Sequence, residues 1–334
     1  MVLLKDNKDL LITSEKQLRA IIPTYPKILD KRIRPELDRY CFELIKFSRF
    51  IIAAYGDSHH PMQPLASNDV VIVDSKTISI PLNREASTEW DCTYASLYFI
   101  VPGVGHGLRV NGKTQRNEMH LVLQIDSVYL HCARAAARAE LWNNSEESSL
   151  VKAIQLTSPK EFTSASPFLL LKTMNEIGET ELSPRGDHNG FVHLIDQHRL
   201  FIPESPGNKV AVSARNIIKR ANVELLMFVP GTDAVMHVHG NATLTTNEQL
   251  LDLAVVKNKR PKLGILLEQC HFSIKQCKAI QETQLWLSEN HINPTQLTKF
   301  SKALSAHMNG DGLIGKAATP FISAIVKNDM NNLY

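Results

Sequence analysis

Residues 228–242 read FVPGTDAVMHVHGNA, and residues 100–114 read IVPGVGHGLRVNGKT. Both stretches run from an apolar segment into a Val-Pro-Gly turn. Both also carry a later glycine, Gly112 or Gly240, and these lie 128 residues apart (240 − 112). An apolar run followed by a Pro-Gly turn is typical of a β-strand entering a hairpin. The match indicates that one strand-turn-strand unit is written twice, provided that other blocks repeat in the same order.

Two further pairs of blocks keep that order. Upstream, VIVDSKTISIP at 71–81 faces HLIDQHRLFIP at 193–203, at an offset of 122 (203 − 81). Downstream, YLHCARAAARAELW at 129–142 faces SIKQCKAIQETQLW at 273–286, at an offset of 144 (286 − 142). Both downstream blocks are predicted to be helices that end in Leu-Trp. We interpret the chain as a tandem duplication whose second copy carries insertions.

Within each copy the strands outnumber the helices and arrive as hairpins separated by proline or glycine. This pattern favours a mainly β fold of two tandem antiparallel barrels with peripheral helices over a parallel βαβ sheet. We predict N-terminal helices and the first barrel within 1–145, the second barrel within 146–290, and a C-terminal tail at 291–334. One helix is expected in the tail at 293–308, followed by glycine-rich turns. The copies are expected to pack as an intramolecular pseudo-dimer.

The composition argues against several classes of protein. Formal net charge is +3, with basic and acidic residues interspersed, which is too small to indicate a nucleic-acid partner. No apolar run approaches the roughly 18 residues of a membrane span, and the first residues lack a cleavable signal pattern. The five cysteines form no CxxC pair, which is typical of reduced thiols. We therefore expect a cytoplasmic protein with a small-molecule ligand and neither nucleic-acid nor membrane partners.

The most specific motifs lie in residues 183–231: SPRGD at a strand end, IPESPGN at a turn, and SARN at a helix start. This run resembles the flavin-binding split-barrel family related to pyridoxamine 5'-phosphate oxidase, and in particular its bacterial subgroup with S-P-R-G-D, I-P-x-x-P-G-N and S-x-R-N motifs. HCARA at 131–135 resembles the C-terminal H-C-x-[KR]-A helix of that subgroup, and ITSEKQLRAII at 12–22 resembles its N-terminus. The resemblance covers most of residues 11–290. It implies a six-stranded split barrel, a dimer, and one FMN at each of two subunit interfaces, with both subunits held here in one chain.

The second copy carries the residues that suit a flavin phosphate. Gly207 lets the backbone approach a ligand, Ser213 is predicted to cap the helix, and the first helical turn favours an anion. Arg185 is expected to face the flavin, with Asp187 holding it in place, and the strand at 199–203 to lie along the ring edge. The alternative is an ordinary solvated helix start with a surface salt bridge. The predicted cofactor contacts in this copy are Ser183, Arg185, Asp187, Ile202, Pro203, Asn208, Lys209, Ser213, Arg215 and Asn216.

The first copy has lost the phosphate side but keeps the other side of the site. QPLAS at 63–67 replaces SPRGD, and the shorter segment at 82–96 lacks the Ser-Ala-Arg-Asn helix start. The second copy has Lys275 and Gln276 where the first keeps His and Cys. We therefore predict one composite flavin site per chain and a lost symmetry-related site. The predicted contacts from the first copy are His131, Cys132 and Arg134, the first and last of which would share a helix face.

The alternative for His131 and Cys132 is packing at the interface between the barrels. Cys132 as a redox nucleophile is the weaker interpretation, since nothing in the sequence fixes its ionisation. His237 and His239 lack an identifiable third ligand, so no metal site is predicted.

The resemblance implies an FMN-dependent oxidoreductase, with the flavin carrying the hydride or electron chemistry. No general base stands out, so the catalytic residues and the substrate are left unassigned. A true pyridoxamine-phosphate oxidase is disfavoured, because the chain after Trp286 contains neither Arg nor Trp. Two alternatives stay open: a flavin-binding or other ligand-binding protein without turnover, and a haem-handling split barrel with a tail histidine such as His307 as ligand.

Overall fold

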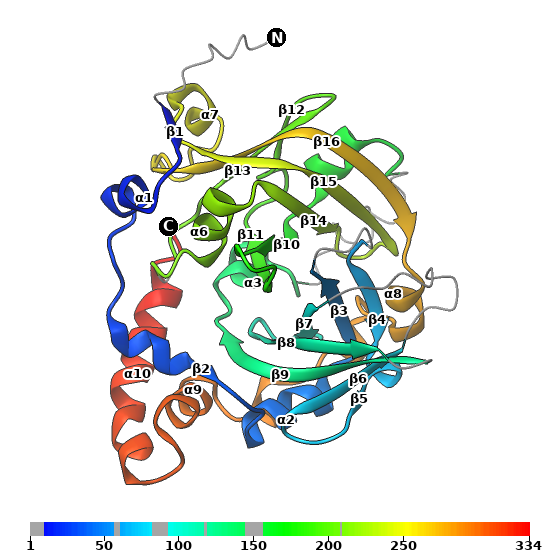
Figure 1. Ribbon diagram of the computed structural model, residues 1–334, viewed down its shortest axis with the longest axis vertical. Coiled ribbons are helices and arrows are strands. Elements are labelled where there is room, and N and C mark those ends of the chain that lie inside the picture. Colours follow the sequence, from blue (N-terminus) through cyan, green and yellow to red (C-terminus); the bar gives the residue numbers. More distant parts are fainter. Residues whose placement is uncertain (1–9, 57–60, 82–92, 117–118, 144–155, 208) are drawn as a thin grey trace.

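The computed structural model describes residues 10–56, 61–81, 93–116, 119–143, 156–207 and 209–334. Their strands form two antiparallel sheets, each built mainly from one half of the chain, with helices at the periphery (Figure 1). The first sheet contains β2 (Ile33–Arg34), β3 (Phe50–Tyr55), β4 (Gln63–Ala66), β5 (Val71–Ile72), β6 (Thr77–Pro81), β7 (Tyr94–Ile100), β8 (Gly107–Arg116) and β9 (His120–His131). The second contains β1 (Leu11–Ile12), β10 (Phe168–Met174), β11 (Thr180–Gly186), β12 (His193–Asp196), β13 (Arg199–Pro203), β14 (Asn222–Phe228), β15 (Ala234–Thr245) and β16 (Gly264–Gln276).

The two sheets have the same strand order. The first runs β4-β3-β7-β8-β9-β6-β5 and the second β11-β10-β14-β15-β16-β13-β12. The mainly β fold of two antiparallel, split-barrel-like halves is thus confirmed, with eight strands to each sheet in the described residues rather than six. One of the two additional strands in each sheet is a short N-terminal strand that joins the ladder, β1 beside β15 and β2 beside β9.

The residue pairing is also the same in both halves. Ile80 faces Leu121 in the first sheet, and Ile202 faces Ile265 in the second, which reproduces the offsets of 122 (202 − 80) and 144 (265 − 121). The glycine of the opening repeat lies at a break in the β8–β9 register, and its counterpart lies at a break between β15 and β16. The blocks matched by sequence therefore occupy equivalent places in the two sheets.

The two halves contact each other through pairs of aromatic side chains. The rings of Phe50 and Phe228 lie edge to face with centroids 6.1 Å apart. Trp142 and Trp286, which end the two matched blocks, lie 5.6 Å apart. Their indole N–H groups donate to the carbonyl oxygens of Val104 (2.9 Å) and Thr232 (2.8 Å), which are equivalent positions of the repeat (232 − 104 = 128). These contacts give the two halves a shared core, as expected for a pseudo-dimer.

The helices partly follow the predictions. The starts of α1 and α5 carry capping boxes at Ser14 and Ser158, and Asp38 caps α2. The predicted helices over 129–142 and 273–286 were wrong in extent, because β9 and β16 continue in the sheet ladders as far as His131 and Gln276. The helices are α1 (Glu15–Ile21), α2 (Arg39–Phe47), α3 (Arg134–Arg138), α5 (Pro159–Ala165), α6 (Val212–Lys219), α7 (Glu248–Asp252), α8 (Lys278–Thr283), α9 (Phe300–Asn309) and α10 (Leu313–Asn331). Short 3-10 turns lie at Lys27–Arg32, Ser67–Asp69, Ser288–Asn290 and Pro294–Gln296.

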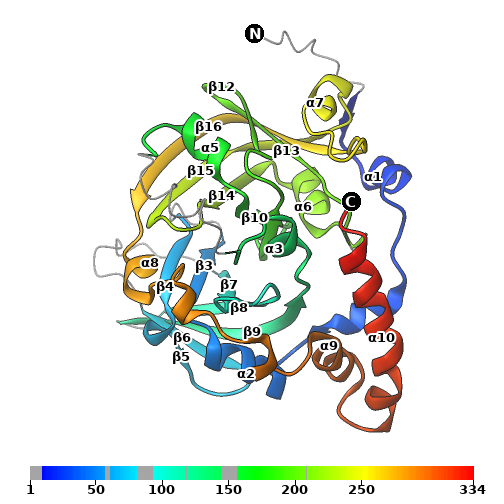
Figure 2. The same cartoon turned by 180° about the vertical axis from the view of Figure 1, so that it is seen from behind.

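The C-terminal region forms two packed helices rather than one helix and turns. α9 and α10 lie side by side along the edge of both halves, and the C-terminus reaches α6 (Figure 2). His307 of α9 is fully buried and its Nδ1 lies 2.6 Å from Oδ2 of Asp38, so α9 is tied to the start of α2. None of the helices in the described residues has the length and apolar character needed to cross a membrane.

Candidate functional site

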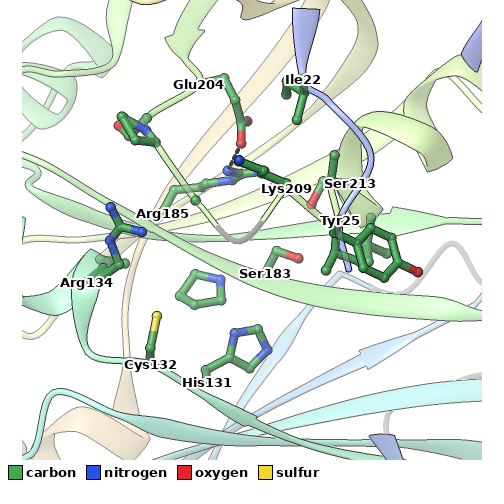
Figure 3. A pocket seen from close by; sticks show the side chains of 18 of the residues that line it. Ile22, Tyr25, His131, Cys132, Arg134, Ser183, Arg185, Glu204, Lys209 and Ser213 are labelled. Atoms are coloured by element: carbon green, nitrogen blue, oxygen red, sulfur yellow. Dashed lines mark hydrogen bonds and ion pairs between the residues drawn. The ribbon is translucent and has the colours of Figure 1, made fainter. Parts of the chain in front are cut away.

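One large cavity, of about 1410 Å³, lies between the two halves (Figure 3). The first half contributes the end of β9 and α3. The second contributes β11, the segment after β13 and the start of α6, and α9 and α10 line the cavity as well. The cavity brings together most of the predicted contacts: His131, Cys132, Arg134, Ser183, Arg185, Asp187, Pro203, Lys209, Ser213, Arg215 and Asn216. Ile202 is instead fully buried in the core of the second sheet, and Asn208 lies outside the described residues.

The start of α6 is the part of the cavity best suited to an anion. Ser213 does not cap this helix as predicted. The cap is Ala211, at φ 55°, and no side chain caps the helix. Lys209 also takes a left-handed conformation, at φ 63°, which is unfavourable for a residue with a Cβ. Arg19 holds the turn by donating to the carbonyl oxygens of Lys209 (2.9 Å) and Val210 (3.3 Å). The first turn of α6 therefore keeps its N–H groups and positive dipole end for a ligand.

The SPRGD residues lie at the end of β11, but they contact different partners from those predicted. Arg185 pairs with Glu204 (Nη1–Oε1 2.7 Å) and not with Asp187. Glu204 lies nineteen residues further along the chain and is brought beside Arg185 by the turn after β13, which sequence proximity does not reveal. The buried carboxylate of Asp187 accepts hydrogen bonds from the hydroxyls of Ser205 (3.3 Å) and Tyr334 (2.6 Å).

Asn216 of α6 has a structural contact of its own. Its side chain is 7% exposed, and its amide donates to the hydroxyl of Thr173 in β10 at 3.0 Å. This bond fixes α6 against the second sheet. Asn216 thus positions the helix start while it lines the cavity.

The first half contributes a strand end rather than one helix face. His131 is the last residue of β9 and Arg134 the first of α3, so the predicted common helix face does not exist. The His131 ring lies edge-on to Tyr98 and Tyr129, with centroids 5.4 Å and 4.7 Å away. Burial, followed by the charge of nearby guanidinium groups, holds the pKa of His131 well below its ordinary value, so the imidazole is neutral at pH 7. Figure 3 shows His131 and the exposed Cys132 across the cavity from Glu204.

Arg109 was not predicted as a site residue. It lies in β8, is 5% exposed, forms an ion pair with Glu181 of β11, and donates to the carbonyl oxygen of Leu182 at 3.1 Å. Burial raises the pKa of Glu181, and the charge of Arg109 opposes that shift. This pair joins the two halves at the cavity wall. The signal in the sequence was an arginine between two apolar residues, Leu108 and Val110, at the position of His237 in the repeat (237 − 128).

Side-chain nitrogen atoms without a hydrogen-bond partner are concentrated around the cavity. Nine such buried side-chain nitrogens occur in the described residues, and seven belong to residues that line this cavity. They are the Nε atoms of Arg32, Arg109, Arg134, Arg185 and Arg215, and the Nε2 atoms of His131 and His193. Buried polar atoms in proteins are almost always hydrogen-bonded, so this set of mainly cationic donors fits a ligand rich in acceptor oxygens.

The equivalent site of the first half is only partly described. Phe50 faces Ala66 as Phe168 faces Gly186, so QPLAS does occupy the place of SPRGD, with Leu65 where the second half has Arg185. The segment 82–92, which would hold the phosphate loop, lies outside the described residues. Loss of that loop stays a prediction.

No protein-family model matches the chain, and no curated protein sequence matches it significantly. Among solved structures, HupZ from Group A Streptococcus is 14% identical, with 36% of this chain and 95% of that chain covered and a TM-score of 0.31. A putative pyridoxamine 5'-phosphate oxidase from Lactobacillus delbrueckii is 15% identical (40% and 93% covered, TM-score 0.26). HutZ, the heme storage protein from Vibrio cholerae, is 16% identical (35% and 90% covered, TM-score 0.23). At these TM-scores the likeness identifies neither a ligand nor a reaction.

Proposed function

We propose that the protein binds FMN in the cavity between its halves and acts as an FMN-dependent oxidoreductase. The observation that supports this most is the meeting of an uncapped helix start with unpaired arginine nitrogens from both halves. FMN is a dianion with further acceptor atoms on its ring, which is the kind of ligand this donor set fits.

The residues divide into two groups by their place in the cavity. Arg215, Lys209 and the first N–H groups of α6 would hold the phosphate, and Arg185, fixed by Glu204, would lie beside them. Neutral His131 would offer Nε2 to the ring without adding a charge. FMN supplies the hydride or electron transfer when bound, and the protein supplies binding, orientation and electrostatics.

We further propose that the halves arose by duplication and share one flavin per chain. The first half has Leu65 in place of Arg185, and the second has Lys275 in place of His131 (131 + 144), so each half lacks what the other keeps. A small-molecule substrate or electron acceptor would use the space beside the flavin.

The test is the absorbance spectrum and released cofactor of the purified protein. One FMN per chain is expected, and two per chain would refute the single composite site. Arg215→Gln should weaken FMN binding roughly tenfold to a hundredfold, because a hydrogen bond to a charged group contributes about 1.5–3 kcal/mol. Lys46→Gln, an exposed cation at the end of α2, is the control and should change nothing. Failure of the protein to bind added FMN at all would refute the proposal.

Measurements on the same purified protein distinguish the proposed function from two alternatives. Reduction by a nicotinamide donor followed by reoxidation with an acceptor distinguishes an oxidoreductase from a flavin-binding protein without turnover. A Soret band would indicate haem. The geometry disfavours His307 as an axial ligand, because Nδ1 lies 2.6 Å from Asp38 and Nε2 lies 3.2 Å from the carbonyl oxygen of Arg32.

A further inference from the structure

α3 buries two positive charges beside the cavity. Arg134 and Arg138 are four residues apart on this helix. The side chain of Arg134 is 11% exposed and Arg138 is 9% exposed. Burial, together with the like charge of Arg134, lowers the pKa of Arg138. Of the carboxylates in the described residues, only that of Asp329 is within ion-pair distance of either arginine, at 3.9 Å from Arg134. Burying cations with so little compensation is unfavourable unless a function requires it.

The fold itself does not require buried cations at this place. α8 is the equivalent helix of the second half, and it packs on β4 as α3 packs on β11. Lys278 and Glu282 occupy the equivalent positions (134 + 144 and 138 + 144). They form an ion pair with each other at 3.0 Å, with side chains that are 85% and 48% exposed. At the equivalent place in the second half, the helix thus carries a solvent-exposed ion pair whose two charges neutralise each other.

Residues 332–334 accept hydrogen bonds from the two arginines of α3 and from a nearby lysine. Arg134, Arg138 and Lys259 donate to the backbone oxygens of residues 332, 333 and 334 at 2.9, 2.7 and 2.9 Å. The phenol of Tyr334 donates to Asp187, and its ring lies under the guanidinium of Arg138 at 5.7 Å. The oxygens of residues 332 and 333 are neutral carbonyl acceptors, so they satisfy the geometry of the two arginines without adding a compensating charge.

We propose that Arg134, Arg138 and Lys259 form a subsite for the carboxylate or phosphate group of a small-molecule ligand, and that residues 332–334 fill it until such a ligand displaces them. An anionic oxygen makes a charge-assisted bond about twice as strong as a neutral carbonyl does, and a planar acid group matches the guanidinium fork. Arg138 also donates to the carbonyl oxygen of Pro206 at 2.6 Å, in the turn that leads to α6, so the subsite adjoins the proposed phosphate site.

The wall next to this subsite defines the rest of the ligand. Phe321 and Ile325 lie four residues apart on α10 and line the cavity, yet they are 71% and 40% exposed. Apolar side chains that face an accessible cavity favour an apolar ligand body. The subsite therefore fits an amphipathic acid, with the acidic group on α3 and the apolar body along α10.

The test compares the full chain with a variant lacking residues 332–334, both free of flavin. Each is titrated by calorimetry with inorganic phosphate and, in a second arm, with acetate. If residues 332–334 fill the subsite in nine molecules of ten, their removal strengthens anion binding about tenfold, because apparent affinity scales with the competent fraction. The anion that binds more tightly to the truncated chain identifies the acid group. Both chains are free of flavin, so a failed flavin assignment would not change this result.

Hydrogen exchange gives a second readout on the full chain. Adding the anion should speed exchange in the peptide that covers residues 326–334, because the anion displaces that segment. In the truncated chain, Arg138→Gln should remove the gained affinity. Lys259→Gln, at an exposed position where folding is not at risk, should reduce it, and Lys278→Gln on α8 should leave it unchanged. Equal affinities of the full and truncated chains in both arms would overturn the proposal, as would exchange that responds to neither anion.

Discussion

The close approach of α3 to β11 at Gly186 should be essential for how the two halves meet at the cavity. A Cβ on Gly186 would lie 2.9 Å from the carbonyl carbon of Ala135, nearer still to its oxygen, and 3.1 Å from Cβ of Ala139. The obstacle is mainly backbone, so it cannot rotate away and α3 must move. Overpacking of this kind costs about 1–3 kcal/mol. Gly186→Ala should lower the free energy of unfolding by that amount and weaken ligand binding, because α3 carries Arg134 and Arg138.

Urea unfolding followed by fluorescence and by circular dichroism measures this change, and agreement of the two signals checks for a two-state transition. Ala66 provides the matched control, because it holds the equivalent position in β4 and already carries a Cβ. Ala66→Gly should cost roughly 0.5–1 kcal/mol through backbone entropy alone and leave ligand binding intact. An unchanged unfolding midpoint and unchanged binding in Gly186→Ala would refute the reasoning.

Three further changes test contacts away from α3. Lys172 and Glu224 form a buried ion pair at 2.7 Å, so Lys172→Met should cost about 3–5 kcal/mol in urea unfolding by stranding the carboxylate. Burial raises the pKa of Asp38, but the hydrogen bond and charge of His307 outweigh it and the net pKa is lowered. The stability that this pair contributes is therefore present above the ordinary Asp pKa of about 3.9 and is lost as pH falls. In Asp38→Asn the measured free energy of unfolding should depend less on pH below that value. Burial lowers the pKa of His106 to about 4, so the free energy of unfolding should rise from about pH 4 to 6.5, and His106→Gln should remove that rise.

Much of the sheet architecture could be predicted because strand signals are local. Apolar runs, Pro-Gly turns and paired glycines recur at an offset that is constant within each block. A one-residue slip in strand pairing would turn every side chain to the opposite face of the sheet, so the offsets also indicate the register of the strands. The Ser/Thr start of the first helix was also readable, and Ser14 does cap α1. The second tail helix was missed because Gly315 and Pro320, both helix breakers, lie inside α10. Gly315 is needed there, since a Cβ would collide with the carbonyl oxygen of Gly310.

The candidate site was less predictable than the sheets. The motifs in the second half located the cavity, but the partner of Arg185 depended on a turn nineteen residues away. The pairing of Arg109 with Glu181 joins residues 72 positions apart (181 − 109). No periodicity or spacing reports either pair. The first forms only when the turn after β13 folds back on β11, and the second only when the two halves dock.

The sequence by itself determined the repeated strands, their order and their register, since alternation and turn chemistry act between neighbouring residues. Tertiary structure alone decided which charges are buried. Arg134 and Lys278 are equivalent in the repeat, yet the arginine is enclosed and the lysine is solvated. The difference arises because α10 carries residues 332–334 to α3. Burial, and the electrostatics that follow from it, is a property of what packs against a residue and not of its place in a repeat.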